Sequence, residues 1–235
     1  MVRVARKIHR ITGYLVFIQV LLWIAGGVVF SLIPFDSLVK GGAVTNVSSA
    51  PNFPDDWLQL TGDSLLSLDN INHIQSHNSS QGVLLEVSVG SSTRWLRLSD
   101  GQSMKEPTVE GITRYADSIY TGPGNHLSTR RLTQPDSTVL GLVDELYGRK
   151  DIWQVNYSDG ARTRLYFDGS SGRYLTVRNN YWVVFDALWR MHIMDYGEGE
   201  NFNNLLLRVF SVLAAVFALS GAVLTINALL RAVRR

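Results

Sequence analysis

The chain has 235 residues, of which 46% are hydrophobic, and its 22 basic and 20 acidic side chains leave a net charge of +2 at pH 7. The absence of cysteine excludes disulfides, thiol redox chemistry, cysteine-zinc sites and covalently attached c-type haem. All 20 acidic residues lie between positions 36 and 200, so the excess of basic residues sits at the chain ends and gives no support to nucleic-acid binding.

Residues 11–35 are expected to form a first transmembrane helix, because they contain no charged residue and one strongly polar side chain, Gln19. A helix needs about 20 apolar residues to cross about 30 Å of hydrocarbon at 1.5 Å per residue. The alternative is a cleaved signal peptide, whose apolar stretch is usually only about 7–15 residues, and no small-x-small cleavage site follows this segment. A signal anchor is therefore favoured, preceded by a cytoplasmic tail over residues 1–10.

Residues 204–230 are expected to form a second transmembrane helix, which is uncharged from position 209 onward and is followed by a tail over 231–235. Neither tail contains an acidic residue, and together the tails carry seven basic ones: Arg3, Arg6, Lys7, Arg10, Arg231, Arg234 and Arg235. Lys and Arg are retained on the cytoplasmic side. The sequence therefore predicts a two-pass inner-membrane protein with both termini in the cytoplasm and residues 36–203 in the periplasm.

The predicted outer domain is α+β. Residues 64–74 are expected to be helical, and residues 83–89 and 93–98 to form a hairpin around a Gly-Ser-Ser turn. Apolar residues at a 3–4 spacing predict a helix over 108–120. The other expected elements are a strand, a short helix and a three-stranded meander, over 127–132, 139–146, 152–157, 163–167 and 173–177.

The two strand-rich regions resemble each other. Aligning Val87 with Val155 places Asp100 on Asp168, which predicts an internal duplication. The alternative is chance similarity, since short strand-turn-strand units look alike.

Several segments resemble the bacterial PepSY-associated transmembrane proteins. Residues 7–13 (KIHRITG) resemble the family's entry into its first helix, and residues 165–175 (LYFDGSSGRYL) resemble the strand-turn-strand of a PepSY unit. Residues 187–196 (ALWRMHIMDY) resemble the segment before the last helix, and residues 203–206 and 218–221 resemble its exit. The order and spacing of these segments carry the resemblance.

The resemblance implies two membrane helices flanking a periplasmic PepSY-like domain of antiparallel sheet plus helices, with a tight turn at Asp168 and Gly172. Many relatives have four membrane helices, and Gly169 stands where a proline is usual. PepSY units are associated with propeptides and inhibitors of secreted peptidases. The resemblance therefore implies a binding, regulatory or accessory subunit that works with a membrane or periplasmic protein partner, or as a homo-oligomer.

Membrane PepSY proteins also include haem-bearing reductases of siderophore-bound iron, so an electron-transfer subunit is the alternative. Haem b normally needs histidine, and the candidates at matching family positions are His9 and His192. About 30 Å of hydrocarbon is expected to separate them, so a haem would be shared across an oligomer or with a partner. The simpler interpretations are a polar anchor for His9 and interfacial packing for His192.

Two further histidines, His73 and His77, have the i, i+4 spacing that on a helix can hold a metal ion. No third ligand is evident, so a solvated pair on the predicted helix is favoured. No nucleophile, phosphate-binding or dinucleotide motif occurs. Catalysis by this chain alone is not expected.

Small residues spaced four apart predict a close antiparallel pair of membrane helices: Gly27, Ser31, Ser211 and Ala215. Taking Leu22 level with Phe217, Gln19 falls beside Ser220 and is expected to hydrogen-bond to it. Arg208 is expected to extend outward from the membrane. The alternative is that these small residues face lipid or a second copy of the chain.

Overall fold

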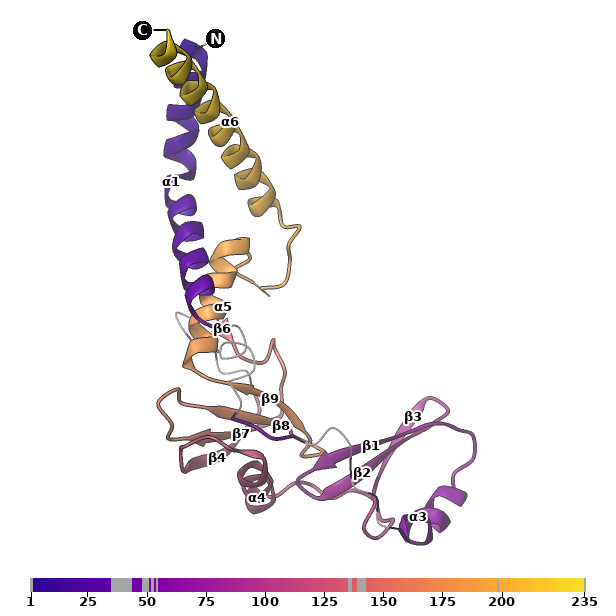
Figure 1. Cartoon of the computed structure of the whole chain (residues 1–235). Coiled ribbons are helices and arrows are strands. Elements are labelled where there is room, and N and C mark those ends of the chain that lie inside the picture. The colour runs from indigo at the N-terminus through magenta and orange to yellow at the C-terminus, as the bar shows by residue number, and fades with distance from the viewer. Residues whose placement is uncertain are drawn as a thin grey trace. The chain divides into compact units, whose positions relative to one another are not determined.

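The computed structural model describes residues 2–34, 44–47, 51, 53, 55–134, 137–138, 143–197 and 199–234. They form helices and antiparallel sheets, as the α+β prediction requires (Figure 1). The chain divides into two compact units. The helical unit comprises Met1–Pro34, Val139–Val143 and Val184–Arg235, and the sheet unit comprises Phe35–Thr138 and Asp144–Val183.

Two long apolar helices, α1 (Val2–Leu32) and α6 (Leu205–Val233), dominate the helical unit. Each contains an 18-residue window with a mean hydropathy of 2.4, and each is long enough to cross a membrane. This confirms the prediction of two terminal helices that are long and apolar enough to cross a membrane. Helix α1 begins well before position 11, so the basic residues of the N-terminal tail lie on its first turns.

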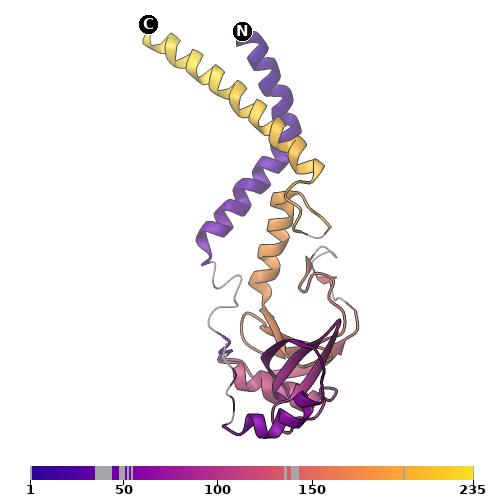
Figure 2. The same cartoon turned by 90° about the vertical axis from the view of Figure 1, so that its right-hand side faces the viewer.

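The two long helices pack against each other as a crossed pair, with both chain termini at the same end (Figures 1 and 2). Asn204 caps the start of α6, because its side-chain oxygen accepts a 2.8 Å hydrogen bond from the Leu207 amide. A capping side chain satisfies one of the four amides that the first turn of a helix leaves unpaired.

A third helix, α5 (Asn180–Ile193), has no counterpart among the predicted elements. Its last carbonyl groups have no partner within the helix, and side chains from both long helices supply donors. Gln19 donates to the Met191 carbonyl at 2.9 Å, and Trp23 donates to the His192 carbonyl at 2.7 Å. Asn204 donates to the Ile193 carbonyl at 2.8 Å. Three successive carbonyls are thus capped from α1 and the start of α6.

The first sheet is antiparallel and has the order β1-β2-β3, from β1 (Ile71–Ser79), β2 (Gly82–Val89) and β3 (Ser92–Arg97). Helix α3 (Trp57–Leu66) packs on it over a core of Leu85, Val87, Leu96 and Leu98. The two predicted strands are confirmed, but the helix predicted over 64–74 is wrong beyond Leu66, where α3 ends. Asn70 adopts a left-handed conformation with φ of 58°, which breaks the helical path, and β1 then pairs with β2.

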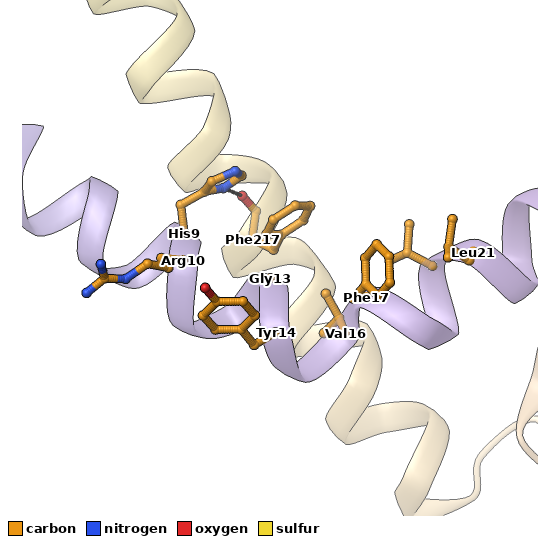
Figure 3. Close-up of a pocket in the computed structure, with 9 residues that line it drawn as sticks. His9, Arg10, Gly13, Tyr14, Val16, Phe17, Leu21 and Phe217 are labelled. Carbon is orange, nitrogen blue, oxygen red and sulfur yellow. Dashed lines mark hydrogen bonds between the residues drawn. The ribbon is translucent and has the colours of Figure 1, made fainter.

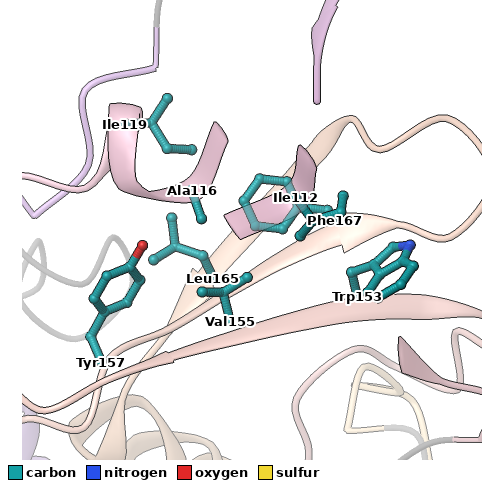
Figure 4. Close-up of a cluster of buried hydrophobic side chains, with 8 residues drawn as sticks. All are labelled: Ile112, Ala116, Ile119, Trp153, Val155, Tyr157, Leu165 and Phe167. Atoms are coloured by element: carbon teal, nitrogen blue, oxygen red, sulfur yellow. The ribbon is translucent and has the colours of Figure 1, made fainter. Parts of the chain in front are cut away.

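The second sheet has the order β4-β7-β8-β9 and is also antiparallel. Its strands are β4 (His126–Leu132), β7 (Ile152–Tyr157), β8 (Arg164–Asp168) and β9 (Tyr174–Arg178). Helix α4 (Val109–Ile119) covers one face, as its apolar spacing predicts. Figure 4 shows the buried residues between them: Ile112, Ala116, Ile119, Trp153, Val155, Tyr157, Leu165 and Phe167.

Two short strands, β5 (Ser137–Thr138) and β6 (Val143–Asp144), precede β7. Of the helix predicted over 139–146, residues 139–142 lie outside the described residues. From Val143 onward the chain forms β6 and a turn, so that part of the prediction is wrong. The predicted duplication of the two sheet regions stays a prediction.

The two sheets join where the end of β1 meets the start of β9. Ser79 and Arg173 form an isolated antiparallel bridge, and the Ser80 amide donates to the Gly172 carbonyl at 3.1 Å. We call this contact the sheet joint. It brings together residues more than 90 positions apart in the sequence.

Candidate functional site

The turn between β8 and β9 positions the candidate site. One carboxylate oxygen of Asp168 accepts hydrogen bonds from the Ser170 and Ser171 amides at 3.2 and 2.8 Å, and from both hydroxyls. Burial alone would raise the pKa of Asp168, but these hydrogen bonds, led by those from Ser171, outweigh it and lower that pKa. The charged carboxylate therefore holds the turn closed.

Gly172 ends this turn in the left-handed region, with φ of 67°, as a tight turn at this position requires. A Cβ atom here would overlap the Ser80 hydroxyl and would lie 3.1 Å from Ser80 Cβ. Glycine therefore permits both the turn and the close approach of the two chain segments at the sheet joint. The next residue, Arg173, projects from this joint.

Arg173 lies against an imidazole and an indole ring. Its Nη1 lies 3.1 Å from His77 Nδ1, and its guanidinium carbon lies 5.2 Å from the centre of the Trp95 ring. Its Nε is buried and has no hydrogen-bond partner in the described part of the chain. The guanidinium is thus held by a cation–π contact with Trp95 and one hydrogen bond to His77, while its Nε–H donor stays unpaired among the described residues.

His77 links Arg173 to a carboxylate. Its Nε2 lies 2.8 Å from Glu86 Oε2. A guanidinium can only donate, so Nδ1 accepts from Arg173, and Nε2 carries the proton that it donates to Glu86. The strand register explains the grouping, since Glu86 pairs with Gln75 on one side and Trp95 on the other, which puts His77, Glu86 and Trp95 on one face.

The sequence interpretation of the His73/His77 pair was wrong for His77. The pair lies on strand β1 instead of a helix, and the half-buried His77 is hydrogen-bonded on both ring nitrogens. His73 is exposed, as expected of a solvated residue. Among the described residues, no group of three His, Asp or Glu side chains could hold a metal ion.

These side chains border a pocket of about 230 Å³, which we call the Arg173 pocket. It is lined by Val47, Pro51, Gln75, Ser76, His77, Asn78, Tyr115, Arg173 and Tyr174. Burial raises the pKa of Tyr115 to about 12, and burial also raises the pKa of Tyr174. Both hydroxyls therefore stay protonated at neutral pH and can donate hydrogen bonds.

The sequence did not identify Arg173, Trp95 or Tyr115 as site residues. The one available signal was that Arg173 directly follows the last glycine of the PepSY-like segment, at a fixed place beside a tight turn. The pairing of β1 with β9 that brings His77 to Arg173 left no pattern in the sequence.

A second candidate site is a groove of about 620 Å³ at the crossing of α1 and α6, which we call the His9 groove (Figure 3). The His9 ring stacks on the Phe217 ring, with 4.2 Å between centroids, and its Nδ1 lies 3.0 Å from the Phe217 carbonyl. A carbonyl only accepts, so Nδ1 carries the proton and Nε2 presents a lone pair. Among the described residues, no hydrogen-bond donor occupies that lone pair.

His192 lies in a different part of the helical unit. Its ring stacks on Trp189 with 6.2 Å between centroids, and its buried Nδ1 has no hydrogen-bond partner among the residues that the structure describes. Its carbonyl meets Trp23, which is fourteen residues from His9 on α1, or about 21 Å along a helix. One chain therefore does not place His9 and His192 on the two faces of a single haem.

The predicted packing of α1 on α6 was wrong in its register, that is, in which residues of the two helices lie side by side. His9 lies beside Phe217, where Leu22 was expected, a difference of thirteen residues or about 20 Å. The small residues expected at the interface are exposed: Gly27, Ser31, Ser211 and Ala215. Glycines do permit close approach, but at Gly13, whose Cβ would lie 3.1 Å from Phe217, and at Gly221, whose Cβ would lie 3.0 Å from His9.

The predicted Gln19–Ser220 hydrogen bond was wrong for the same reason. Both side chains are buried, at 6% and 8% exposure, but Gln19 caps α5, and the Ser220 hydroxyl contacts His9 Nδ1 and the Phe217 carbonyl. Arg208 is exposed, as expected for an outward-extending side chain.

Comparison with known proteins returned no relative. No family model matches the chain, and neither a curated protein nor a solved structure matches it.

Proposed function

We propose that the chain is a two-pass inner-membrane protein of the PepSY-associated type that presents its sheet unit to the periplasm. Two terminal apolar helices with both ends together, and seven basic residues in tails without an acidic one, support this topology. Its role is that of a binding, regulatory or accessory subunit, and the Arg173 pocket is the binding site.

The state of Arg173 is the observation that carries this proposal. Arg164 and Arg190 pair with the carboxylates of Glu145 and Asp186, both at 2.6 Å. Arg178 forms no ion pair among the described residues, but its guanidinium donates to the backbone carbonyls of Glu145 and Val177. In the described part of the chain, Arg173 instead contacts a neutral imidazole and an indole ring, with Nε unpaired. Burying an unpaired donor of a cation is costly, and a ligand entering the pocket would remove that cost.

Photocrosslinking in native membranes tests the proposal. A photoreactive residue replaces Ser76, which lines the Arg173 pocket, in the full chain. We expect an adduct that Arg173→Gln abolishes and Arg94→Gln leaves intact, since Arg94 is exposed on β3 and its loss changes the net charge equally. An adduct that survives Arg173→Gln, or none in any background, contradicts the proposal.

The second candidate function is a haem-dependent electron-transfer subunit, and the His9 tautomer favours it. An imidazole that donates through Nδ1 to a carbonyl presents Nε2 in the form that ligates metals. The separation from His192 requires the second ligand to come from another copy or a partner, with haem supplying the redox chemistry when bound. Soret absorbance of the detergent-purified chain that His9→Ala removes supports this function, and its absence after haem supplementation contradicts it.

A further inference from the structure

The Arg173 pocket presents donors and one cation to whatever enters it. Among the described residues that line it, Arg173 is the one permanently charged side chain, and the hydroxyls of Tyr115 and Tyr174 remain protonated. Glu86 lies beside the pocket, but its carboxylate already accepts from His77. A cationic ligand would therefore meet Arg173 without a free carboxylate, whereas an acceptor would meet the Nε–H of Arg173, which has no partner in the described part of the chain.

The geometry of the guanidinium selects among acceptors. His77 engages Nη1, which leaves the side of the group where Nε–H and one Nη2–H point in parallel. That fork matches the two oxygens of a carboxylate, which accept from it in a bidentate pair. The Trp95 ring lies against the guanidinium face and leaves its edge to the ligand.

The volume of the pocket limits the size of the ligand. About 230 Å³ is below the roughly 300–1,000 Å³ that drug-sized ligands and cofactors occupy. The pocket thus suits a short group with one negative charge, flanked by the apolar side chains of Val47 and Pro51.

From these observations we infer that the Arg173 pocket binds a carboxylate group, held in a bidentate pair by the Nε and Nη2 edge of Arg173. The carboxylate belongs to a small organic acid or to an acidic side chain or C-terminus of a polypeptide, because the recognising chemistry is the same. This inference rests on the proposed binding function and specifies its ligand.

Nuclear magnetic resonance of the full chain in detergent micelles tests the inference at the atom concerned. The signal of the Arg173 Nε–H group, assigned by its loss in Arg173→Lys, is followed during titration with sodium acetate at constant ionic strength. We expect a saturable downfield shift, because an unpaired N–H gains a charged acceptor. Acetamide, which has the same shape without the charge, should require at least about ten-fold higher concentration for the same shift.

Variants and other ligands in the same titration distinguish bidentate carboxylate binding from a general effect of charge. The Trp95 indole signal, which the ligand also perturbs, should respond at least about ten-fold more weakly in Arg173→Lys, which keeps the charge but loses the fork. Arg94→Gln should change the acetate affinity less than about two-fold, because screening leaves little coupling between exposed charges. Equal responses to acetate and acetamide, or tighter binding of inorganic phosphate than of acetate, would overturn the inference.

The source of the carboxylate is decided by comparing acetate with a short extended peptide that contains one glutamate, and with its glutamine counterpart. Tighter binding of the glutamate peptide assigns a polypeptide, and equal binding of acetate assigns a small acid. A Ser76 photoadduct together with no response to any carboxylate would retain the binding function and refute the carboxylate. Acetate binding without an adduct would retain the carboxylate and refute the protein-partner role.

Discussion

Substitution of Gly172 by alanine tests the structure of the sheet joint, because two separable costs arise there. The left-handed conformation costs an L-residue about 1–2 kcal/mol. In addition, the new Cβ overlaps the Ser80 hydroxyl and lies 3.1 Å from Ser80 Cβ and 3.3 Å from Ile112 Cδ1. Overpacking of this kind costs about 1–3 kcal/mol, so the total expected loss is about 2–5 kcal/mol.

Gly148 provides the matched control. Its φ is 77°, and a Cβ there would meet nothing within 4 Å. Gly148→Ala should therefore cost only the conformational part, about 1–2 kcal/mol. The free energy of opening is measured by native-state hydrogen exchange at the β8 amides in the full chain, since that strand is buried in the core.

A third variant isolates the steric part. In the described part of the chain the Ser80 hydroxyl is buried without a hydrogen-bond partner, so Ser80→Ala loses no bond there while it removes the overlapping atom. Combined with Gly172→Ala, it should recover part of the loss. If Gly172→Ala costs no more than Gly148→Ala, the close approach of β1 to the β8–β9 turn is refuted.

Three other predictions follow from the structure. In the full chain, Ser92→Cys should react with an impermeant maleimide from the periplasmic side and Val2→Cys should not; the reverse pattern would refute the proposed topology. Gln19→Leu should lower the stability of the helical unit by about 0.6–2 kcal/mol, because the Met191 carbonyl loses its donor. The control variant Ile18→Leu, at an exposed position, should leave the stability unchanged. Equal effects of the two variants would contradict the capping role of Gln19. Because the folded-state pKa of Asp168 is lowered, its stabilisation is present above about pH 4 and is lost as pH falls through the folded pKa. The difference in opening free energy between wild type and Asp168→Asn should therefore shrink in acid, and a constant difference would refute a charged carboxylate in the turn.

The local hydropathy and spacing of residues in the sequence were enough to predict several elements of the fold. An uncharged run identifies α1 and α6, and a 3–4 spacing of apolar residues identifies α4. Residues 71–74 were misread because Ile71 and Ile74 fit helical spacing, whereas their pairing with β2 decides the outcome. Helix α5 was missed because its aromatic residues resemble those that gather at a membrane surface.

The candidate site was less accessible to prediction. The turn at Asp168 and Gly172 follows from residue types, because a short acidic side chain and a glycine favour such turns. The neighbours of Arg173 depend on a joint between strands whose residues are 96 positions apart, as for His77. The depth at which α1 crosses α6 likewise depends on Phe217 fitting against Gly13 and His9 fitting against Gly221, which no helical period encodes.

The sheet joint also has a consequence for motion. Among the described residues, one β-bridge, the Ser80–Gly172 amide hydrogen bond and the contacts of Arg173 with His77 and Trp95 hold the joint, whereas β1 and β9 each pair along most of their length within their own sheet. Separation at the joint therefore breaks far fewer interactions than unfolding of either sheet. The walls of the Arg173 pocket come from both sides of this joint. A ligand that contacts both sides would therefore stabilise the closed joint. Slower exchange of the Ser80 amide on occupancy would record that closure.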